Sequence, residues 1–141
     1  MLITGFNGKQ HNWKPRGADF SDSSRSNLHL KIRDLLREIY PFDVIMEEVT
    51  LPGSNRFANK KELTADFFLP NRSMIIEAHG EQHYLYNSFF FKNKFEFAKA
   101  QRRDLDKKAW CESNNIQIIE LKYSDPIDFW RQQIVSRRQE G

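Results

Sequence analysis

Residues 64–84 read TADFFLPNRSMIIEAHGEQHY, and this stretch decides the fold that the sequence predicts. Residues 65–69 are a short apolar and aromatic run, which is typical of a half-buried strand. Pro70 fixes its own φ and Asn71 tolerates the left-handed region, so we expect a tight turn here. Residues 73–79 then predict a second strand. The stretch therefore predicts an antiparallel hairpin with acidic and imidazole side chains at one end.

The predicted hairpin brings two carboxylates together. Asp66 lies on the first strand and Glu77 on the second, and period-two alternation puts Glu77 and His79 on one face. Burying a carboxylate in an apolar strand is unfavourable unless a cation or hydrogen bonds compensate its charge. Paired carboxylates hold Mg²⁺, and a basic group beside them can act on the metal-bound water. We interpret Asp66 and Glu77 as ligands of Mg²⁺, with Mn²⁺ as a substitute; the alternative is solvent-facing carboxylates or a salt bridge to a nearby arginine.

This pattern resembles the core of the PD-(D/E)xK nucleases. Ala65-Asp66 stands where Pro-Asp is usual, and Glu77-Ala78-His79 stands for Glu-x-Lys. The resemblance implies a restriction-endonuclease-like α/β sandwich, in which a mixed central sheet is flanked by helices. It also implies a Mg²⁺-dependent endonuclease that hydrolyses the phosphodiester bonds of DNA.

A longer resemblance covers roughly the last two thirds of the chain. In this part the chain is similar to very-short-patch repair endonucleases and to homing endonucleases described by the motif E-D-x-H-D. The shared features, in chain order, are Asp66, Leu69-Pro70, Met74-Ile75-Ile76, His79-Gly80 and Arg103-Asp104. Very-short-patch enzymes hold a structural zinc with Cys and His; because Cys111 is the single cysteine, we expect no such zinc here.

The resemblance implies roles for further residues. The backbone carbonyl of Ala78 would complete the metal shell, and His79 would hold or deprotonate the attacking water or contact the phosphate. Ungapped counting puts Tyr84 at the family's next histidine, whereas a slip of one residue puts His83 there, and we favour His83 as general base. Asp104 would orient the histidine, with Asp106 as one alternative. For each histidine the competing interpretation is packing in the core, and for Asp104 it is an exposed helix charge.

The first Glu of the family motif has no direct counterpart. Ungapped alignment places His29 or Leu30 at that point, and Asp34 and Glu38 lie one and two helical turns later. The sequence leaves open which of His29, Asp34 and Glu38 completes the site, and whether one or two metal ions bind. A histidine there makes a single-metal mechanism the more natural one.

Basic residues predict contacts with the DNA backbone. Lys92 and Lys94 lie in a Phe-rich segment, and Arg102 and Arg103 lie in a predicted helix. We expect all four to contact phosphates, although the same residues would also suit a solvated surface. Residues 1–27 are polar, with basic residues interleaved with Trp13 and Phe20. We interpret them as an irregular basic arm that follows DNA or as a poorly ordered terminus.

The length of 141 residues fits one domain, which we place at residues 28–141 after the arm. The expected helices cover residues 28–39, 95–114 and a final segment from Pro126; further strands are expected at 43–50 and 116–121. With 22 basic and 19 acidic residues, the bulk charge does not by itself indicate nucleic-acid binding. The lone cysteine fits a reducing compartment, and no stretch is long enough to span a membrane. We expect a cytoplasmic protein, in the host cytoplasm if it is phage-encoded.

The sequence thus predicts a metal-dependent endonuclease that acts on double-stranded DNA. A compact nuclease without a second domain suggests a phage or mobile-element enzyme of the homing type, and double-strand breaks would call for a homodimer. The rival interpretations are a non-catalytic DNA-binding module and a nuclease subunit of a recombination or repair assembly. The target and the choice between nicking and double-strand cleavage are not encoded in any pattern that we recognise.

Overall fold

The computed structural model describes residues 1–17, 25–81, 84 and 91–140, with side chains up to residue 136. Its helices and strands follow the order expected from the sequence, preceded by an additional N-terminal hairpin. In chain order they are β1 (Leu2–Thr4), β2 (Gln10–Asn12), α1 (Asn27–Ile39), β3 (Met46–Thr50), β4 (Thr64–Leu69), β5 (Met74–His79), α2 (Lys94–Ser113), β6 (Gln117–Lys122) and α3 (Ile127–Glu140).

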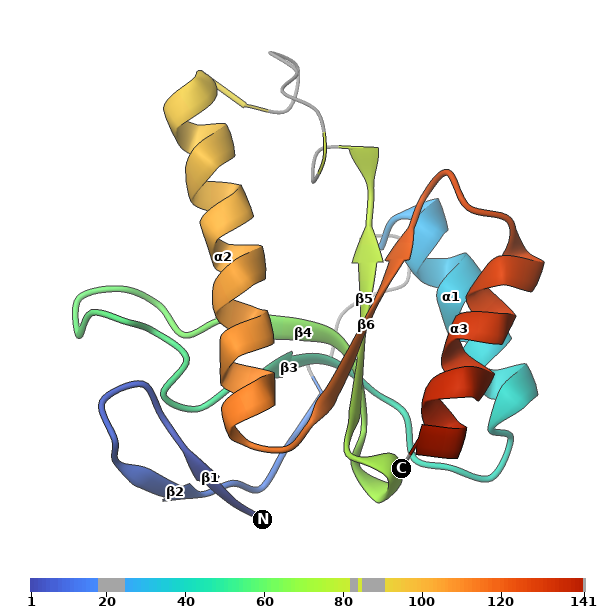
Figure 1. Cartoon of the computed structure of the whole chain (residues 1–141), viewed down its shortest axis with the longest axis horizontal. Helices are drawn as coiled ribbons and strands as arrows, with labels where there is room; N and C mark the ends of the chain where they lie inside the picture. The colour runs from blue at the N-terminus through green and yellow to red at the C-terminus, as the bar shows by residue number, and fades with distance from the viewer. Residues whose placement is uncertain (18–24, 82–83, 85–90, 141) are drawn as a thin grey trace.

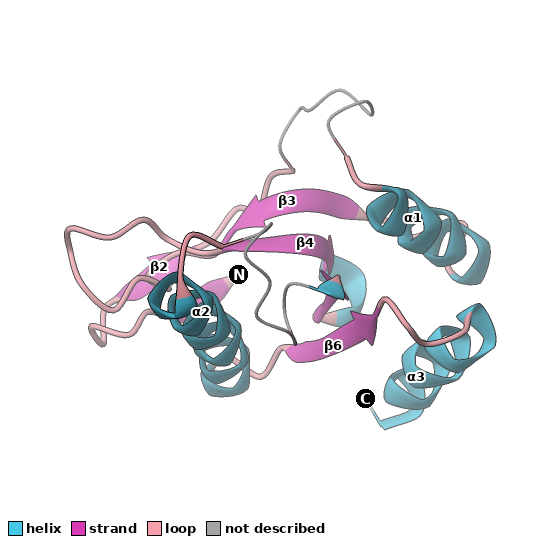
Figure 2. Ribbon diagram, turned by 90° about the horizontal axis from the view of Figure 1, so that it is seen from above, coloured by secondary structure: helices cyan, strands magenta, loops and turns pink. Residues whose placement is uncertain are grey.

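A four-stranded mixed sheet forms the centre, with strand order β3-β4-β5-β6. β4 pairs antiparallel with both β3 and β5, and β6 runs parallel to β5. Helices α1 and α3 cover one face, whereas α2 lies on the other (Figures 1 and 2). The expected α/β class, with a mixed sheet between helices, is therefore confirmed.

The expected central hairpin is present as β4 and β5. A single turn of 3₁₀ helix at residues 70–72 joins the strands, and the left-handed residue is Ser73 (φ 48°), not Asn71. Proline at the first position of that turn needs no N–H donor, which suits a helix start. Pairing in register from Phe67 opposite Ile76 to Leu69 opposite Met74 fixes which side chains face each helix layer.

Two hydrophobic cores hold the layers together. The first packs α1 and α3 on the sheet through buried side chains such as Leu36, Phe67, Ile76 and Trp130. The second packs α2 and the N-terminal hairpin on the opposite face, and it contains Trp13, Phe68, Ile75, Trp110 and Cys111. Both faces of the sheet are therefore covered by helices.

The N-terminal segment differs from the irregular arm that we expected over residues 1–27. β1 and β2 pair as a hairpin, and Trp13 is buried against Phe68, with ring centroids 4.9 Å apart. Gly53 has a left-handed φ of 69° and touches Gly5, so the hairpin docks where a side chain would not fit. Trp13 is therefore a core residue and is not available to stack on DNA bases; Phe20 lies outside the described residues.

The capped starts of α1 and α2 set the positions of the residues that flank the strand ends. Ser26 caps α1, which begins at Asn27, because Ser26 Oγ accepts the N–H of His29 (3.1 Å). Asn93 caps α2 in the same way through the N–H of Glu96. In the described part of the chain, no helix has the length and apolar character needed to cross a membrane.

Candidate metal and catalytic site

The strand registers align four carboxylates across the sheet. On β3 and β4, the pairs on either side of Glu48 and Asp66 set these two residues opposite each other. Continuing the β4–β5 register by one position sets Asp66 opposite Glu77, and Glu77 is paired with Glu120 on β6. Four acids in one row repel each other unless cations lie among them.

Asp66 and Glu77 hold the two central strands together where the backbone ladder ends. The N–H of Asp66 donates to Glu77 Oε2, and the N–H of Ala78 donates to Asp66 Oδ2, both at 2.7 Å. Each carboxylate thus replaces a backbone acceptor of the neighbouring strand. The pair predicted from the sequence is brought together, and its side chains are held in fixed orientations.

Lys107 reaches the pair from α2. Its Nζ lies 2.5 Å from Glu77 Oε1, and both side chains are largely buried. Burial, followed by the charge of Asp66, raises the pKa of Glu77 to about 8 despite this lysine. Burial would lower the pKa of Lys107, but the carboxylates of Glu77 and Asp66 outweigh it and raise that pKa. Lys107 is therefore a permanent positive charge at neutral pH.

Three potential metal donors converge beside this pair. One donor atom each from His29, Glu48 and Asp66 lies within 4.8 Å of the others. Burial and the nearby Asp66 raise the pKa of the Glu48 carboxyl, because two negative charges share a poorly hydrated space. A bound cation would relieve that repulsion.

His29 is held in a defined orientation by its neighbours. Its Nε2 lies 2.6 Å from Glu47 Oε1, and its ring stacks on Phe67. Burial would raise the pKa of Glu47, but hydrogen bonds from Arg33 and His29 lower it, so the carboxylate is ionised and can only accept. Nε2 therefore carries the hydrogen, and in the neutral ring Nδ1, which lies 3.9 Å from Glu48 Oε1, keeps the lone pair. A carboxylate on the far nitrogen is the usual arrangement around a metal-binding histidine.

An unusual backbone angle at Glu48 allows both glutamates to reach the same imidazole. Glu48 has φ 54°, in the left-handed region that most side chains avoid. Regular alternation would point Glu47 and Glu48 to opposite faces of the sheet. The break in alternation lets Glu47 approach one ring nitrogen while Glu48 approaches the other.

The predicted histidines have different outcomes. His79 is buried, with Nε2 3.1 Å from Glu120 Oε2 and Nδ1 3.4 Å from the hydroxyl of Tyr84. Glu120 is also bound by Lys108 Nζ at 2.6 Å. Among the described residues, Lys107 is the cation bound to Glu77, and a role for His79 at the lysine position of Glu-x-Lys stays a prediction. His83 lies outside the described residues.

The remaining predicted residues line α1 and α2. Asp34 and Glu38 are exposed on α1, and Glu38 pairs with Arg131, so of the three alternatives His29 is the one that joins the donor cluster. Asp106 pairs with Arg56 and Arg102. The N–H of Ala78 is engaged by Asp66, while a metal-binding role for its carbonyl stays a prediction.

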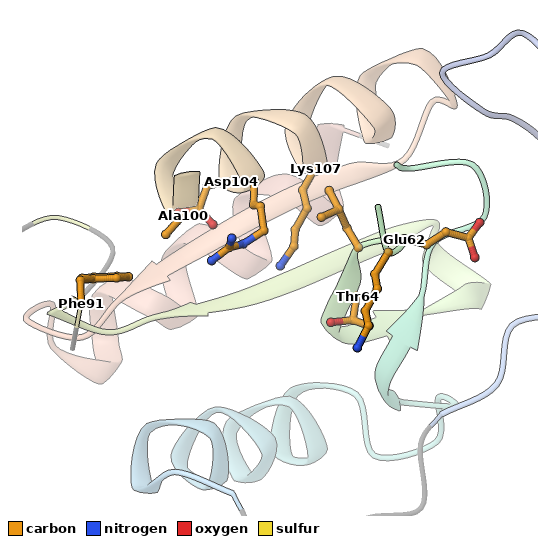
Figure 3. A pocket seen from close by; sticks show the side chains of 9 residues that line it. Glu62, Thr64, Phe91, Ala100, Asp104 and Lys107 are labelled. Atoms are coloured by element: carbon orange, nitrogen blue, oxygen red, sulfur yellow. The ribbon is translucent and has the colours of Figure 1, made fainter. Parts of the chain in front are cut away.

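A pocket of about 390 Å³ lies between α2 and the start of β4 (Figure 3). Asp104 and Arg103 line it beside Lys107, and the role of Asp104 in orienting a histidine stays a prediction. Lys92 and Lys94 are exposed near the start of α2, and Arg102 is exposed farther along it. These positions are open to a nucleic acid, and the phosphate contacts stay predictions.

Two glutamates were not predicted from the sequence: Glu48, which completes the donor cluster, and Glu47, which binds His29. Glu47 and Glu48 are adjacent in the sequence, and only the register of β3 on β4 shows which one faces Asp66. Lys107 belongs to the same basic helical stretch as Arg102 and Arg103, yet its ammonium is buried against a residue thirty positions away. The adjacent pair of acids in a predicted strand was the signal that could have drawn attention to Glu48.

No family model and no solved structure match this chain. It is similar to an uncharacterized protein, 033L, of Invertebrate iridescent virus 3, with 37% identity over 62 residues, or 44% of this chain. It is also similar to an uncharacterized protein, 307L, of Invertebrate iridescent virus 6, with 37% identity over 82 residues, or 58% of this chain. The matched segments span 32% and 40% of those relatives, so the chain corresponds to less than half the length of either.

Proposed function

We propose that the protein is a metal-dependent DNA endonuclease of the restriction-endonuclease-like fold. The observation that carries the proposal is the convergence of His29, Glu48 and Asp66 beside the buried Glu77–Lys107 pair. The resemblance of the hairpin to the PD-(D/E)xK core supports it, as does the mixed sheet between helices. Double-stranded DNA is the proposed substrate, with a dimer required for double-strand breaks and the cytoplasm as the proposed site of action.

The donor set fits a divalent cation. Two carboxylates supply the oxygen ligands that Mg²⁺ and Mn²⁺ prefer, and an imidazole nitrogen is a better ligand for a transition metal such as Mn²⁺. His29, Glu48 and Asp66 would hold the ion. Glu77 fits less well in the arrangement observed, because Lys107 and the N–H of Asp66 already occupy its two oxygens. A bound cation would supply charge stabilisation at the phosphate and a more acidic water.

Lys107 and Glu77 would act on the reacting groups from the side of α2. Because Lys107 stays protonated, it would donate hydrogen bonds to a phosphate oxygen or to the attacking water, and it would not take a proton. Glu77, with a pKa of about 8, would release or take up a proton near neutral pH. Glu47 would keep the His29 ring oriented through Nε2.

Incubation with supercoiled plasmid tests the proposal. With Mg²⁺ or Mn²⁺ the full chain is expected to give relaxed circles if it nicks, or linear DNA if it cuts both strands, and EDTA should stop either reaction. Asp66→Asn should be inactive, whereas the matched Asp34→Asn, at an exposed position on α1, should cleave like the parent. Retardation of DNA in a gel without cleavage in either metal would instead identify a non-catalytic binding module.

A further inference from the structure

The pocket beside Lys107 has the form of a groove along one stripe of α2. Four of its residues, Ala100, Arg103, Asp104 and Lys107, lie at positions i, i+3, i+4 and i+7, so they share one helical face. The opposite wall is formed by residues 61–64. A span of seven helical residues is about 10 Å long. In Figure 3, Phe91 lies at one end, and Lys107 and Thr64 lie toward the other.

This groove is continuous with the proposed catalytic site. Lys107 lines the groove and also binds Glu77, and Thr64 precedes Asp66 by two residues on β4. A molecule lying in the groove would therefore adjoin the carboxylates of Asp66 and Glu77. Its volume of about 390 Å³ is that of a small-ligand site, which is far too small for a double helix.

The lining favours an anion. Lys61, Arg103 and Lys107 contribute three positive charges, against two negative charges from Glu62 and Asp104. Lys107 is already paired with Glu77, whereas neither Lys61 nor Arg103 forms an ion pair with another described residue. The carboxylate of Glu62 accepts the N–H of Gly53 at 2.6 Å and points away from Lys107 (Figure 3). An arginine guanidinium matches the oxygens of a phosphate in paired hydrogen bonds.

The groove also offers an aromatic ring. Phe91 is half-buried and packs edge-on against Phe97, with centroids 5.4 Å apart, which supports the ring from behind. A supported aromatic side chain next to basic residues is the combination that binds single-stranded nucleic acid, through stacking and phosphate contacts. A base inside a duplex has both faces covered by its neighbours, so only an unpaired base can stack here.

We infer that the groove binds one unpaired nucleotide of the substrate strand, with Arg103 and Lys61 on its phosphate and Phe91 against its base. The inference rests on the proposed function and narrows its substrate to duplex DNA that carries an unpaired nucleotide next to the cleaved bond, as at a fork or flap. Lys107 would then lie between the bound nucleotide and the proposed metal centre.

Binding measured without cleavage tests this inference. Fluorescence anisotropy of the full chain in EDTA would compare a labelled fork with a fully paired duplex of the same sequence. We expect the fork to bind about 10-fold more tightly, because stacking of one base on an aromatic ring contributes about 1–3 kcal/mol. Phe91→Ala and Arg103→Gln should remove most of this preference. Phe91→Tyr should keep it, as should Arg37→Gln, which makes the same change at an exposed position on α1.

Equal affinities for fork and duplex would overturn the inference, as would a fork preference that survives both Phe91→Ala and Arg103→Gln. The result is separable from the plasmid assay. If the chain cleaves plasmid but does not prefer the fork, the nuclease proposal is supported and the groove proposal is rejected. If the chain prefers the fork through Phe91 but never cleaves, the groove proposal is supported and the nuclease proposal is rejected.

Discussion

At the scale of single residues, the site is an excess of buried and half-buried acid that is only partly neutralised. Glu47, Glu48, Asp66 and Glu77 lie close together, and the nearby cations are Arg25, Arg33 and Lys107. Glu47 is satisfied by arginine and histidine, and Glu77 by lysine. Glu48 and Asp66 are the pair left to share a further cation, with Arg25 3.6 Å from Glu48.

Removing the charge of Glu48 should weaken the site selectively. Glu48→Gln keeps the shape of the side chain but removes an anionic donor, so we expect at least about a 10-fold loss of Mn²⁺ affinity and about a 100-fold loss of cleavage rate. The matched control is Glu38→Gln on α1, which carries the same change at an exposed position. Equal effects of the two substitutions, measured by calorimetric titration and plasmid cleavage, would remove Glu48 from the site.

Lys107 should matter for the rate more than for metal binding. Lys107→Met is expected to lower the cleavage rate at saturating metal by about 100-fold, because one fixed positive charge is lost at the phosphate. Lys108→Met serves as the control, since Lys108 pairs with Glu120 and is half exposed. The double variant Lys107→Met/Glu77→Gln removes the unpaired buried carboxylate. If it recovers stability and also activity, the role of Lys107 is structural.

The raised pKa of Glu77 predicts how stability changes with pH in EDTA. Its folded pKa, about 8, lies above the ordinary value of 4.5, so the folded chain holds a proton that the unfolded chain releases. The stability from this proton is complete below about pH 4.5 and is lost as the pH rises through about 8, a change on the order of a few kcal/mol. Chemical denaturation from pH 5 to 8.5 should show this fall for the parent, and Glu77→Gln should flatten it. Identical slopes for both proteins would contradict the assignment.

At the scale of helices and strands, the sequence predicted the elements well because the signals are local. Residues 65–79 carry alternation and a turn, and the stripe of Leu and Ile in residues 28–39 marks α1, so both elements were correctly placed. The partners of the strand ends were harder to predict. Glu48 depends on strand register and on a left-handed φ, and Lys107 depends on how α2 crosses the sheet.

The N-terminal hairpin is the element that local pattern missed. Its strands are three residues each, and their stability comes from tertiary contacts of Ile3 and Trp13 with the second core. Short hairpins have marginal stability in isolation, so their sequences need not carry a distinctive local pattern. Basic residues around Trp13 suggested a DNA-binding arm, whereas the indole fills the space beside Trp110, with centroids 5.5 Å apart.

Truncating Trp13 should therefore destabilise the whole domain. Trp13→Ala removes a fully packed ring and is expected to lower the free energy of unfolding by about 3–5 kcal/mol. Lys14→Ala, the neighbouring exposed position, should change it by less than about 0.5 kcal/mol. Urea denaturation would measure both. A small effect of Trp13→Ala together with a loss of DNA affinity would restore the interpretation as a DNA-binding arm.

At the scale of the whole molecule, the fold brings residues from three layers to one row of carboxylates across the sheet. α1 contributes His29, the sheet contributes Glu48, Asp66 and Glu77, and α2 contributes Lys107 and one wall of the groove. No two of these elements alone would make the arrangement. The fold class followed from the sequence, but the site gathers residues from His29 to Lys107, which only the packed layers bring together.

The proposed catalytic site requires a divalent ion bound by His29, Glu48 and Asp66. The most direct test is to measure Mn²⁺ binding by electron paramagnetic resonance. We predict that the full chain binds one Mn²⁺ at this cluster and that Asp66→Asn weakens this binding at least about 10-fold, while Asp34→Asn leaves it unchanged. Mn²⁺ binding of equal strength in the parent and in Asp66→Asn, or no binding by the parent, would contradict the central claim.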